Sequence, residues 1–521
     1  MYCQLDAIVT ASKHNFADKV AIDDNKRQLT YAELDQAINH LASTFLSMGL
    51  AKGDRIAVYL PKQIETVISI LAASRAGLVF VPVNPVLKAP QLAYIVKDCN
   101  VKLLITSQQR AQLSADELAS CHELEQLLLV DGEAELQLSV RQHSWPHTSD
   151  DSQPPAVTVI DQDLAAILYT SGSTGQPKGV CLSHRNLIAG AQSVSQYLHN
   201  TADDKILAVL PLSFDYGLSQ ITTGLLVGAT VVLMEYLLPR DVIRQVAKHQ
   251  ITGLGAVPPL WIQLAKLDWP EEARCLRYFT NSGGAMPQAT LAQLRQALPN
   301  TLPYLMYGLT EAFRSTYLEP RYLDQHPDSI GKAIPNAEVL VLRPDGSECD
   351  VDEPGELVHR GVHVSLGYWN APQKTAERFK PIGSKANYLP ELAVWSGDTV
   401  RRDKEGFLYF IGRKDDMIKS SGYRISPAEL EESLYQMAGI AEVVAVGLPD
   451  DELEQAILLL IKAGSELSEQ DIKRYCQQQL PNYMQPKYIE LVDSLPRNPN
   501  GKIDRKQLQQ DFISKQQGSR A

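Results

Sequence analysis

The sequence predicts an α/β protein with a large N-terminal domain and a small C-terminal α+β domain. Strand-like apolar runs alternate with helix-like periodic segments, which is typical of parallel sheets layered by helices. The length, 521 residues, is too great for one compact core and favours two or more domains. Toward the end of the chain, strands are expected at 442–447, 456–462 and 488–492, with a helix at 468–479.

The first helix is expected to begin after Thr30. In Thr30-Tyr-Ala-Glu33 both side chains can accept hydrogen bonds from backbone N–H groups, as in a capping box, and apolar residues follow at spacings of four and three. Segment 144–157, rich in Pro, Ser and Asp, is expected to be a surface linker. The pattern further predicts strands at 55–60, 78–83, 102–106, 206–210 and 229–234, and helices at 65–76 and 91–98.

Charge and cysteine content argue against several classes of protein. The net charge of −12, without a clustered run of Lys and Arg, argues against nucleic-acid binding. The seven cysteines are scattered and include no C-x-x-C pair, which favours reduced thiols and a cytoplasmic location. The N-terminus lacks a basic region followed by an apolar run, and no apolar stretch reaches the roughly 18 residues that span a bilayer, so neither a signal peptide nor a membrane span is expected.

Small residues, hydroxyls and one lysine are concentrated at 169–179, directly after an apolar run. Such a segment can hold phosphate, because glycines let the backbone approach while N–H and hydroxyl groups point at the oxygens. It is not a Walker loop, since Pro177 precedes Lys178 and Gly179 follows it. On composition alone, a solvated linker is the alternative interpretation.

The stretch Tyr169-Thr-Ser-Gly-Ser-Thr-Gly-Gln-Pro-Lys-Gly179, continued by Val180-Cys-Leu-Ser-His-Arg-Asn186, resembles the signature of the adenylate-forming (AMP-binding) superfamily. This superfamily includes acyl-CoA synthetases, amino-acid adenylation domains and luciferases. Further family motifs follow in order over nearly the whole chain. The resemblance implies an AMP-binding domain at 1–411 and a mobile C-terminal domain at 412–521. It also implies that the ATP phosphates are held by Thr170, Ser171, Gly172, Ser173, Thr174, Gly175 and Lys178.

The same resemblance assigns the rest of the nucleotide site. Segment 278–285 resembles the adenine-binding strand and turn, which ends in Gly283, Gly284 and Ala285. In Tyr307-Gly308-Leu-Thr310-Glu311, it implies that Tyr307 stacks near adenine, Thr310 contacts the α-phosphate, and Glu311 holds Mg²⁺ together with Thr174. Asp398 is expected to bind the ribose hydroxyls, with Arg413 nearby. Alone, these short motifs would be ordinary turns.

In the C-terminal domain, the resemblance implies a hinge at Asp415, a thiol tunnel lined by Gly422 and Tyr423, and a catalytic lysine at Lys502. Lys502 follows a turn rich in Pro, Asn and Gly, so its side chain can reach a neighbouring site. A solvated surface lysine is the alternative. The motif Asn500-Gly-Lys-Ile-Asp504 resembles that of amino-acid adenylation domains more than that of acyl-CoA synthetases.

Two charged residues bear on the acid substrate. The resemblance places Asp215 where adenylation domains bind the α-ammonium group, although an aspartate before a helix is also a common N-cap. Arg314 is expected to meet either Asp215 or a negative or carbonyl group of the ligand, unless it points to solvent. An amino-bearing acid is favoured, because Asp215 and the Asn-Gly-Lys-Ile-Asp ending agree. The predicted substrate pocket comprises Asp215, Tyr216, Ser219, Arg314 and Ser315.

The implied function is an ATP-dependent, AMP-forming acid:thiol ligase that requires Mg²⁺. It would adenylate a carboxylic acid and transfer the acyl group to CoA or to the phosphopantetheine of a carrier protein, which is expected to be a separate molecule. The alternatives are a stand-alone amino-acid adenylation enzyme that loads a peptidyl carrier protein, a luciferase-like oxygenase, and a non-catalytic nucleotide-binding module.

Overall fold

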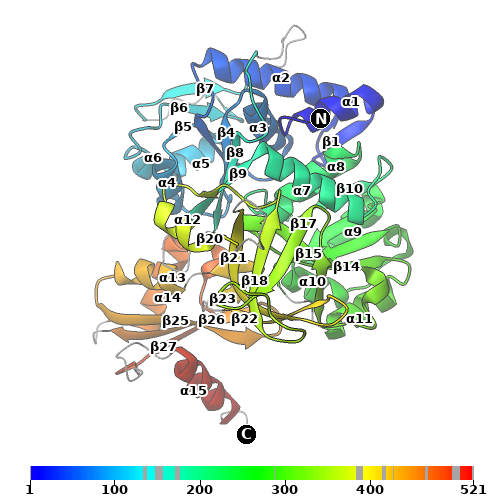
Figure 1. Ribbon diagram of the computed structural model, residues 1–521. Helices are drawn as coiled ribbons and strands as arrows, with labels where there is room; N and C mark the ends of the chain where they lie inside the picture. The colour runs from blue at the N-terminus through cyan, green and yellow to red at the C-terminus, as the bar shows by residue number, and fades with distance from the viewer. Residues whose placement is uncertain are drawn as a thin grey trace.

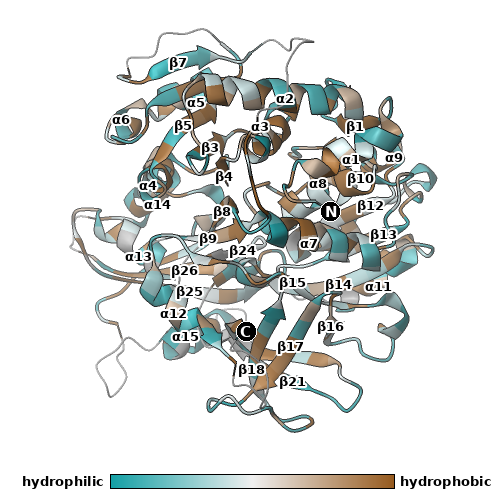
Figure 2. Cartoon of the chain, turned by 45° about the horizontal axis from the view of Figure 1, so that its top comes forward, coloured by the Kyte–Doolittle hydropathy of each residue, from teal (hydrophilic) through white to brown (hydrophobic). Residues whose placement is uncertain are grey.

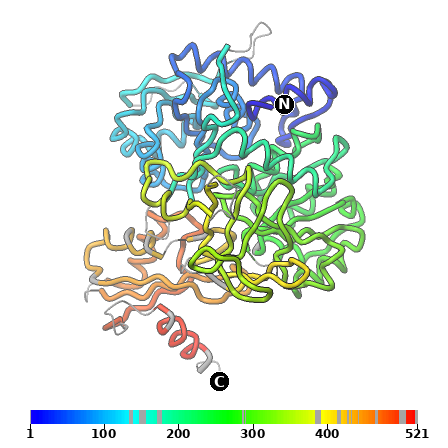
Figure 3. The backbone as a smooth tube through the Cα atoms, viewed as in Figure 1, coloured from blue at the N-terminus to red at the C-terminus, as the bar shows by residue number. Residues whose placement is uncertain are grey.

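The computed structural model describes residues 2–132, 138–146, 156–170, 177–284, 286, 288–382, 391–413, 418–425, 427–463, 467–495 and 505–518. Its strands form three sheets (Figure 1). Two belong to the large N-terminal part of the chain, and the third is built from C-terminal residues, which gather at one end of the molecule (Figure 3). The predicted α/β fold, with a large sheet domain and a small C-terminal domain, is confirmed.

The first sheet has the strand order β19-β9-β8-β4-β3-β5-β6-β7. Strands β8, β4, β3, β5, β6 and β7 pair in parallel, whereas β8 with β9 and β9 with β19 are antiparallel. Its strands are β3 (Arg55–Tyr59), β4 (Val79–Pro82), β5 (Val101–Thr106), β6 (Gln126–Leu129), β7 (Arg141–Ser144), β8 (Leu164–Thr170), β9 (Lys178–Ser183) and β19 (Gly367–Tyr368). The associated helices are α3 (Ile64–Arg75), α4 (Ala89–Asp98), α5 (Gln108–Leu113) and α6 (Ala115–Leu118).

Helix α3 is buried along its whole length except at Glu65, which indicates that it is covered on every side. The predicted capping box is present at the start of α2 (Tyr31–Ser47), where Thr30 and Glu33 exchange hydrogen bonds. The expectation that the first helix begins there is wrong, because α1 (Ala7–Phe16) precedes it. Helix α1 has no side-chain cap bond to signal its start, and it is held instead by burial of Ile8 and Val9.

The second sheet contains fourteen described strands and has two halves of different character. Its parallel half comprises β1 (Val20–Asp23), β10 (Lys205–Ala208), β11 (Thr230–Leu233), β12 (Gly253–Ala256), β13 (Tyr278–Asn281) and β14 (Leu302–Leu309), with β2 (Gln28–Thr30) antiparallel at one edge. The accompanying helices are α7 (His184–Tyr197), α8 (Asp215–Leu226), α9 (Pro239–His249), α10 (Pro258–Ala265), η1 (Glu271–Ala273) and α11 (Gln288–Ala297). Hydrophobic residues are concentrated on the strands and on the sides of the helices that face them (Figure 2).

From β14 onward the second sheet is antiparallel, a feature that the prediction of parallel sheets did not include. These strands are β15 (Phe313–Leu318), β16 (Ser329–Ala333), β17 (Ala337–Leu342), β18 (Gly355–Gly361), β20 (Phe379–Pro381), β21 (Leu392–Arg402) and β22 (Leu408–Arg413), with η2 (Thr310–Ala312), η3 (Pro320–Tyr322) and α12 (Pro372–Arg378). Of the expected linker at 144–157, residue 144 ends β7 and 147–155 lie outside the described residues.

The third sheet has the order β24-β23-β26-β25, and β27 pairs in parallel with β26. Its elements are β23 (Ile418–Ser420), β24 (Tyr423–Ile425), α13 (Pro427–Tyr435), β25 (Ile440–Asp450), β26 (Glu454–Ala463), α14 (Glu469–Gln479), η4 (Asn482–Met484), β27 (Tyr488–Leu491) and α15 (Arg505–Gly518). The hairpin of β23 and β24 lies against the large domain, where Asn84 and Tyr423 are within 3.5 Å of each other. Among the described helices, none combines the length and the apolar character needed to cross a membrane.

Candidate active site

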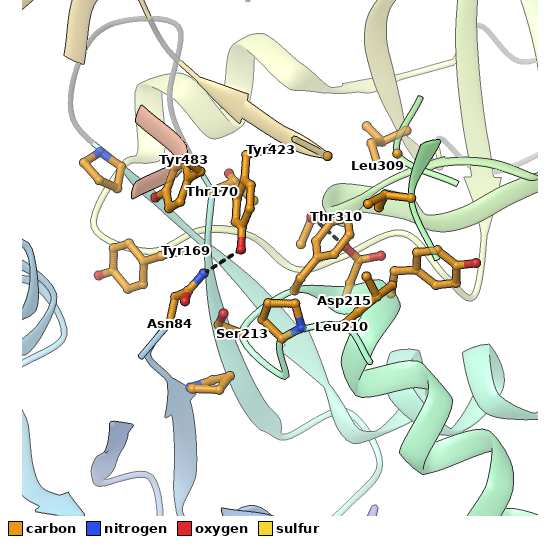
Figure 4. A pocket seen from close by; sticks show the side chains of 18 of the residues that line it. Asn84, Tyr169, Thr170, Leu210, Ser213, Asp215, Leu309, Thr310, Tyr423 and Tyr483 are labelled. Carbon is orange, nitrogen blue, oxygen red and sulfur yellow. Dashed lines mark hydrogen bonds between the residues drawn. The ribbon is translucent and has the colours of Figure 1, made fainter. Parts of the chain in front are cut away.

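A cavity of about 670 Å³ lies between the large domain and the β23–β24 hairpin (Figure 4). Its walls include residues that directly follow the carboxyl ends of parallel strands β4, β10, β12 and β13, which is the usual position of ligand sites in α/β sheets. Strand β8 supplies Tyr169 and Thr170, and the C-terminal domain supplies Gly422, Tyr423 and Tyr483. The cavity is therefore completed by both domains.

The expected acid end of the cavity contains a hydrogen bond between two predicted residues. Thr310 Oγ1, in η2, donates to Asp215 Oδ1 at 3.1 Å (Figure 4). Asp215 is the first residue of α8, and the N-cap position is occupied by Phe214, so the N-cap interpretation of Asp215 is wrong. The residue predicted to meet the α-phosphate and the residue predicted to meet the substrate thus lie side by side.

Arg314 lies on β15, lines the cavity, and is only 2% exposed. Its Nη1 donates to Ser219 Oγ at 3.0 Å, and its guanidinium lies 4.7 Å from the Tyr216 ring centroid and 4.5 Å from that of Phe313. Two of the outcomes considered from sequence are therefore wrong: Arg314 does not point to solvent, and within the described residues it forms no ion pair with Asp215. Tyr216 also lines the cavity, whereas Ser219 and Ser315 lie buried behind its wall.

At the expected phosphate end, Tyr368 connects two predicted residues. Its Oη donates to Glu311 Oε1 at 2.6 Å, and Lys178 Nζ lies 5.3 Å from its ring centroid. Burial, followed by the charge of Glu311, raises the pKa of the Tyr368 hydroxyl, so it remains a donor at neutral pH. No sequence motif indicated Tyr368, because β19 comes close to β9 only through sheet pairing.

The turn between β14 and β15 has an unusual backbone. Phe313 has φ 57° and ψ −144°, a backbone conformation that residues other than glycine rarely adopt. At Gly308, a Cβ atom would lie 2.3 Å from the Phe313 carbonyl oxygen, so only glycine fits there. Strain of this kind concentrates at functional sites, and here it positions Thr310 and Glu311 between the two strands.

The predicted adenosine residues form a second buried contact. Tyr307 Oη donates to Asp398 Oδ2 at 2.5 Å, and the Tyr307 ring lies 6.1 Å from that of His359 with the rings nearly parallel. Asp398 is 1% exposed. Neither Tyr307 nor Asp398 lines the cavity, although Gly308 and Gly283 do, so their adenine and ribose roles stay predictions.

On the C-terminal side, Tyr423 stacks on Tyr483 with ring centroids 3.9 Å apart and an angle of 9°. Asn84 Nδ2 donates to Tyr423 Oη at 3.5 Å across the domain boundary. Gly422 has φ 79°, and a Cβ atom there would lie 2.7 Å from Val257 Cγ2. Gly422 and Tyr423 were predicted to line a thiol tunnel, and both line the cavity; Asn84 and Tyr483 were not anticipated.

Lys62 is a further cavity residue that sequence reasoning missed. Its side chain is 3% exposed, and Nζ donates to the Val209 carbonyl oxygen at 3.0 Å and lies 3.4 Å from Glu235 Oε1. Burial lowers the pKa of this amine, partly offset by Glu235. Lys62 and Glu235 are far apart in the sequence, so no local sequence pattern indicated that they would meet.

The structure describes some of the remaining predicted residues and not others. Thr170 and Lys178 line the cavity on the two sides of the expected phosphate loop, and Gly284 follows β13 close to Glu454. The Arg413 backbone ends β22, with its side chain outside the description. Also outside the described residues lie Ser171, Gly172, Ser173, Thr174, Gly175, Ala285, Asp415 and Lys502.

The family model of AMP-binding enzymes matches residues 9–369, and that of the AMP-binding enzyme C-terminal domain matches 429–502. The chain therefore belongs to the AMP-binding enzyme family, which confirms the predicted superfamily and an enzyme resembling acyl-CoA synthetases.

Two curated relatives illustrate the range of lengths in this family. A linear gramicidin synthase of Brevibacillus parabrevis is 31% identical over 94% of this chain, which spans only 9% of that protein. Long-chain-fatty-acid–CoA ligase of Bacillus subtilis is 28% identical and aligned over 97% of this chain and 94% of its own length. Among solved structures, the amide bond synthetase McbA of Marinactinospora thermotolerans superposes with a TM-score of 0.87 and is 21% identical. The match covers 98% of this chain and 99% of the synthetase, and it shows that the two proteins share a fold.

Proposed function

We propose that this protein is an ATP-dependent, AMP-forming acid:thiol ligase. In the first half-reaction, a carboxylate oxygen of the acid attacks the α-phosphorus of ATP, and the bond to pyrophosphate breaks. In the second, a thiol sulfur attacks the acyl carbon, AMP leaves, and the thiol proton passes to solvent. The observation that carries this proposal is one cavity joining the Thr310–Asp215 pair to Gly422 and Tyr423 of the other domain.

Each end of the cavity suits one half-reaction. Thr310 and Lys178 offer a hydroxyl and a cation where phosphoryl charge would develop, and preorganised groups of this kind usually supply most of the catalysis. Tyr423 and Asn84 form the part of the wall to which both domains contribute, where a thiol would enter between the domains. We further propose domains at 1–411 and 412–521, a hinge at Asp415, and Lys502 as the catalytic lysine of the first half-reaction.

Magnesium fits the phosphate end of the cavity. Mg²⁺ is usually bound by one or two carboxylates together with substrate phosphates, and Glu311 supplies a carboxylate there. Tyr368 orients that carboxylate by its hydrogen bond. When bound, the ion would neutralise charge on the departing pyrophosphate. Glu311, with Thr174 as the second proposed ligand, would hold it.

The acceptor is proposed to be CoA or the phosphopantetheine of a carrier protein. An amino-acid adenylation enzyme is the second candidate, because Asp215 lines the proposed acid end of the cavity and a linear gramicidin synthase is among the relatives. Both candidates predict acid-dependent exchange of labelled pyrophosphate into ATP, and both predict a thioester.

The decisive experiment measures that exchange and then offers CoA or a phosphopantetheinylated carrier protein. Acid-dependent exchange followed by a thioester and AMP is expected. Failure of every acid to support exchange would refute the ligase. Oxygen uptake linked to the adenylate, without a thioester, would instead favour a luciferase-like oxygenase.

A further inference from the structure

Arg314 is a buried cation that no carboxylate of the described residues neutralises. Its Nη1 has one partner, Ser219, while Nε and Nη2 have no hydrogen-bond partner among the residues that the structure describes. Within the described part of the chain, no carboxylate forms an ion pair with it. Guanidinium groups cannot lose their charge at physiological pH, and a buried charge without a partner is strongly unfavourable. The rings of Tyr216 and Phe313 offset part of this cost but supply no hydrogen-bond acceptor.

Arg75 shows how the same protein accommodates a buried arginine that has a structural role. Arg75 is 7% exposed and forms ion pairs with both Asp6 and Asp35, at 2.8 and 2.7 Å. It also donates to Asn39, Thr10 and a backbone carbonyl. Arg314 is more deeply buried, yet it has one neutral partner. Its unused donors therefore point to an acceptor that arrives with the ligand.

The position of Arg314 sets the distance of that acceptor from the reacting carboxylate. Thr310 is bonded to Asp215 at the start of α8, and Arg314 is bonded to Ser219, four residues along the same helix. Four residues advance a helix by about 6 Å. Arg314 thus lines the cavity with its hydrogen-bond partner roughly one helical turn along α8 from the partner of Thr310.

We infer that the acid substrate carries a second anionic group, a carboxylate, about one helical turn from the carboxylate that is adenylated, and that the Arg314 guanidinium binds it. This inference rests on the proposed ligase function. The planar guanidinium matches a carboxylate in a two-point contact, and the flanking rings hold it in place. Four- to six-carbon dicarboxylic acids, with or without an α-amino group, have the required length (on the order of one α-helical pitch).

The test is pyrophosphate exchange with matched acids. Succinate, glutarate, adipate and glutamate would be compared with butyrate, pentanoate, hexanoate, norvaline and the monomethyl ester of glutarate. A preference for the dicarboxylates of about a hundredfold in kcat/KM is expected, since the uncharged analogues leave the guanidinium unpaired. Arg314→Met should remove that preference and improve the use of pentanoate. Comparing exchange with glutarate and with glutamate, which differ by an α-amino group, then tests whether Asp215 binds an α-ammonium group.

A stability measurement separates recognition from a structural role. Arg314→Met should leave the melting temperature of the ligand-free protein unchanged or raise it, because it removes a buried charge that no carboxylate of the described residues neutralises. Arg75→Met is the matched control and should lower it, because Asp6 and Asp35 would lose their cation. Glutarate should raise the melting temperature of the wild type but not that of Arg314→Met.

The outcomes are distinguishable. Exchange with monocarboxylates equal to that with dicarboxylates, or Arg314→Met melting well below the wild type, overturns the inference and leaves the ligase standing. No exchange with any acid, while glutarate still stabilises the wild type through Arg314, refutes the ligase and keeps the dicarboxylate site. Absence of both exchange and stabilisation overturns both.

Discussion

Replacing Gly422 by alanine should separate the two half-reactions. An alanine Cβ at this position would lie 2.7 Å from Val257 Cγ2 and 3.0 Å from Cγ1, which is closer than such atoms approach. Overpacking of this degree costs about 1–3 kcal/mol. If the β23–β24 hairpin moves away from the cavity instead, about 2 kcal/mol lowers the population of the closed arrangement roughly 30-fold.

The expected result is a thioester-forming rate reduced about 30-fold, with pyrophosphate exchange nearly unchanged. The thiol step would be measured with supplied acyl-adenylate, and the first step by exchange. Gly406→Ala is the matched control, because Gly406 also has positive φ, at 85°, but no atom of the described residues lies within 4 Å of its Cβ position. That substitution should lower stability slightly and leave both steps intact.

A second substitution identifies the clash as the cause. Val257→Ala removes two of the three Val257 atoms that the new Cβ meets, including the nearest, and leaves the Cβ of residue 257 at 2.9 Å, so the double variant should recover part of the lost thiol step. Equal loss of both half-reactions in Gly422→Ala, or no recovery in the double variant, would refute the assignment of the hairpin to the thiol step.

Three further predictions use the same assays together with urea unfolding. Lys502→Ala should reduce adenylation by about a thousandfold or more and spare thioester formation from supplied adenylate; equal loss of both would contradict its role. Glu311→Gln should raise the Mg²⁺ concentration needed for exchange, and Tyr368→Phe, which removes the 2.6 Å hydrogen bond that orients Glu311, should raise it about tenfold; an unchanged Mg²⁺ dependence in both variants would contradict the role of Glu311. Burial lowers the pKa of His184 from 6.5 to about 4, and its neutral Nδ1 accepts a hydrogen bond from Leu5 N–H. Between these two pH values the unfolded chain binds one more proton than the folded chain, so the free energy of unfolding decreases as the pH falls. His184→Asn should make the decrease between pH 7 and pH 5 smaller by about 2 kcal/mol. A decrease equal to that of the wild type would be inconsistent with this pKa.

Much of the fold could be predicted because local patterns and burial agree. The capping box at Thr30 and the alternation of strands and helices indicated α2 and the parallel strands β3, β4, β5, β10 and β11 within a few residues, whereas β1, β6, β7 and β12 were not predicted. Helix α1 and the antiparallel strands beyond β14 were missed. The former has no cap bond, and the latter depend on pairing between segments that are distant in sequence.

The candidate site likewise contains residues that sequence motifs predicted and residues that only the folded structure reveals. Thr310, Asp215 and Tyr423 belong to recognisable motifs, and the structure brings them to one cavity. Tyr368 and Lys62 reach that cavity only through tertiary contacts, so nothing in their local sequence distinguished them. Whether Arg314 was paired could not be decided from sequence either, because that depends on which carboxylates fold next to it.

The stacked pair Tyr423–Tyr483 has a consequence for how efficiently ATP is used. An acyl-adenylate is open to attack by water as well as by a thiol, and each molecule lost to water wastes one ATP. Both rings belong to the C-terminal domain, and they lie at the cavity wall beside Asn84. If the proposed function holds, these two aromatic faces keep water from the mixed anhydride while it waits for the thiol. The yield of thioester per ATP consumed, rather than the turnover rate, is then the quantity that this stack governs.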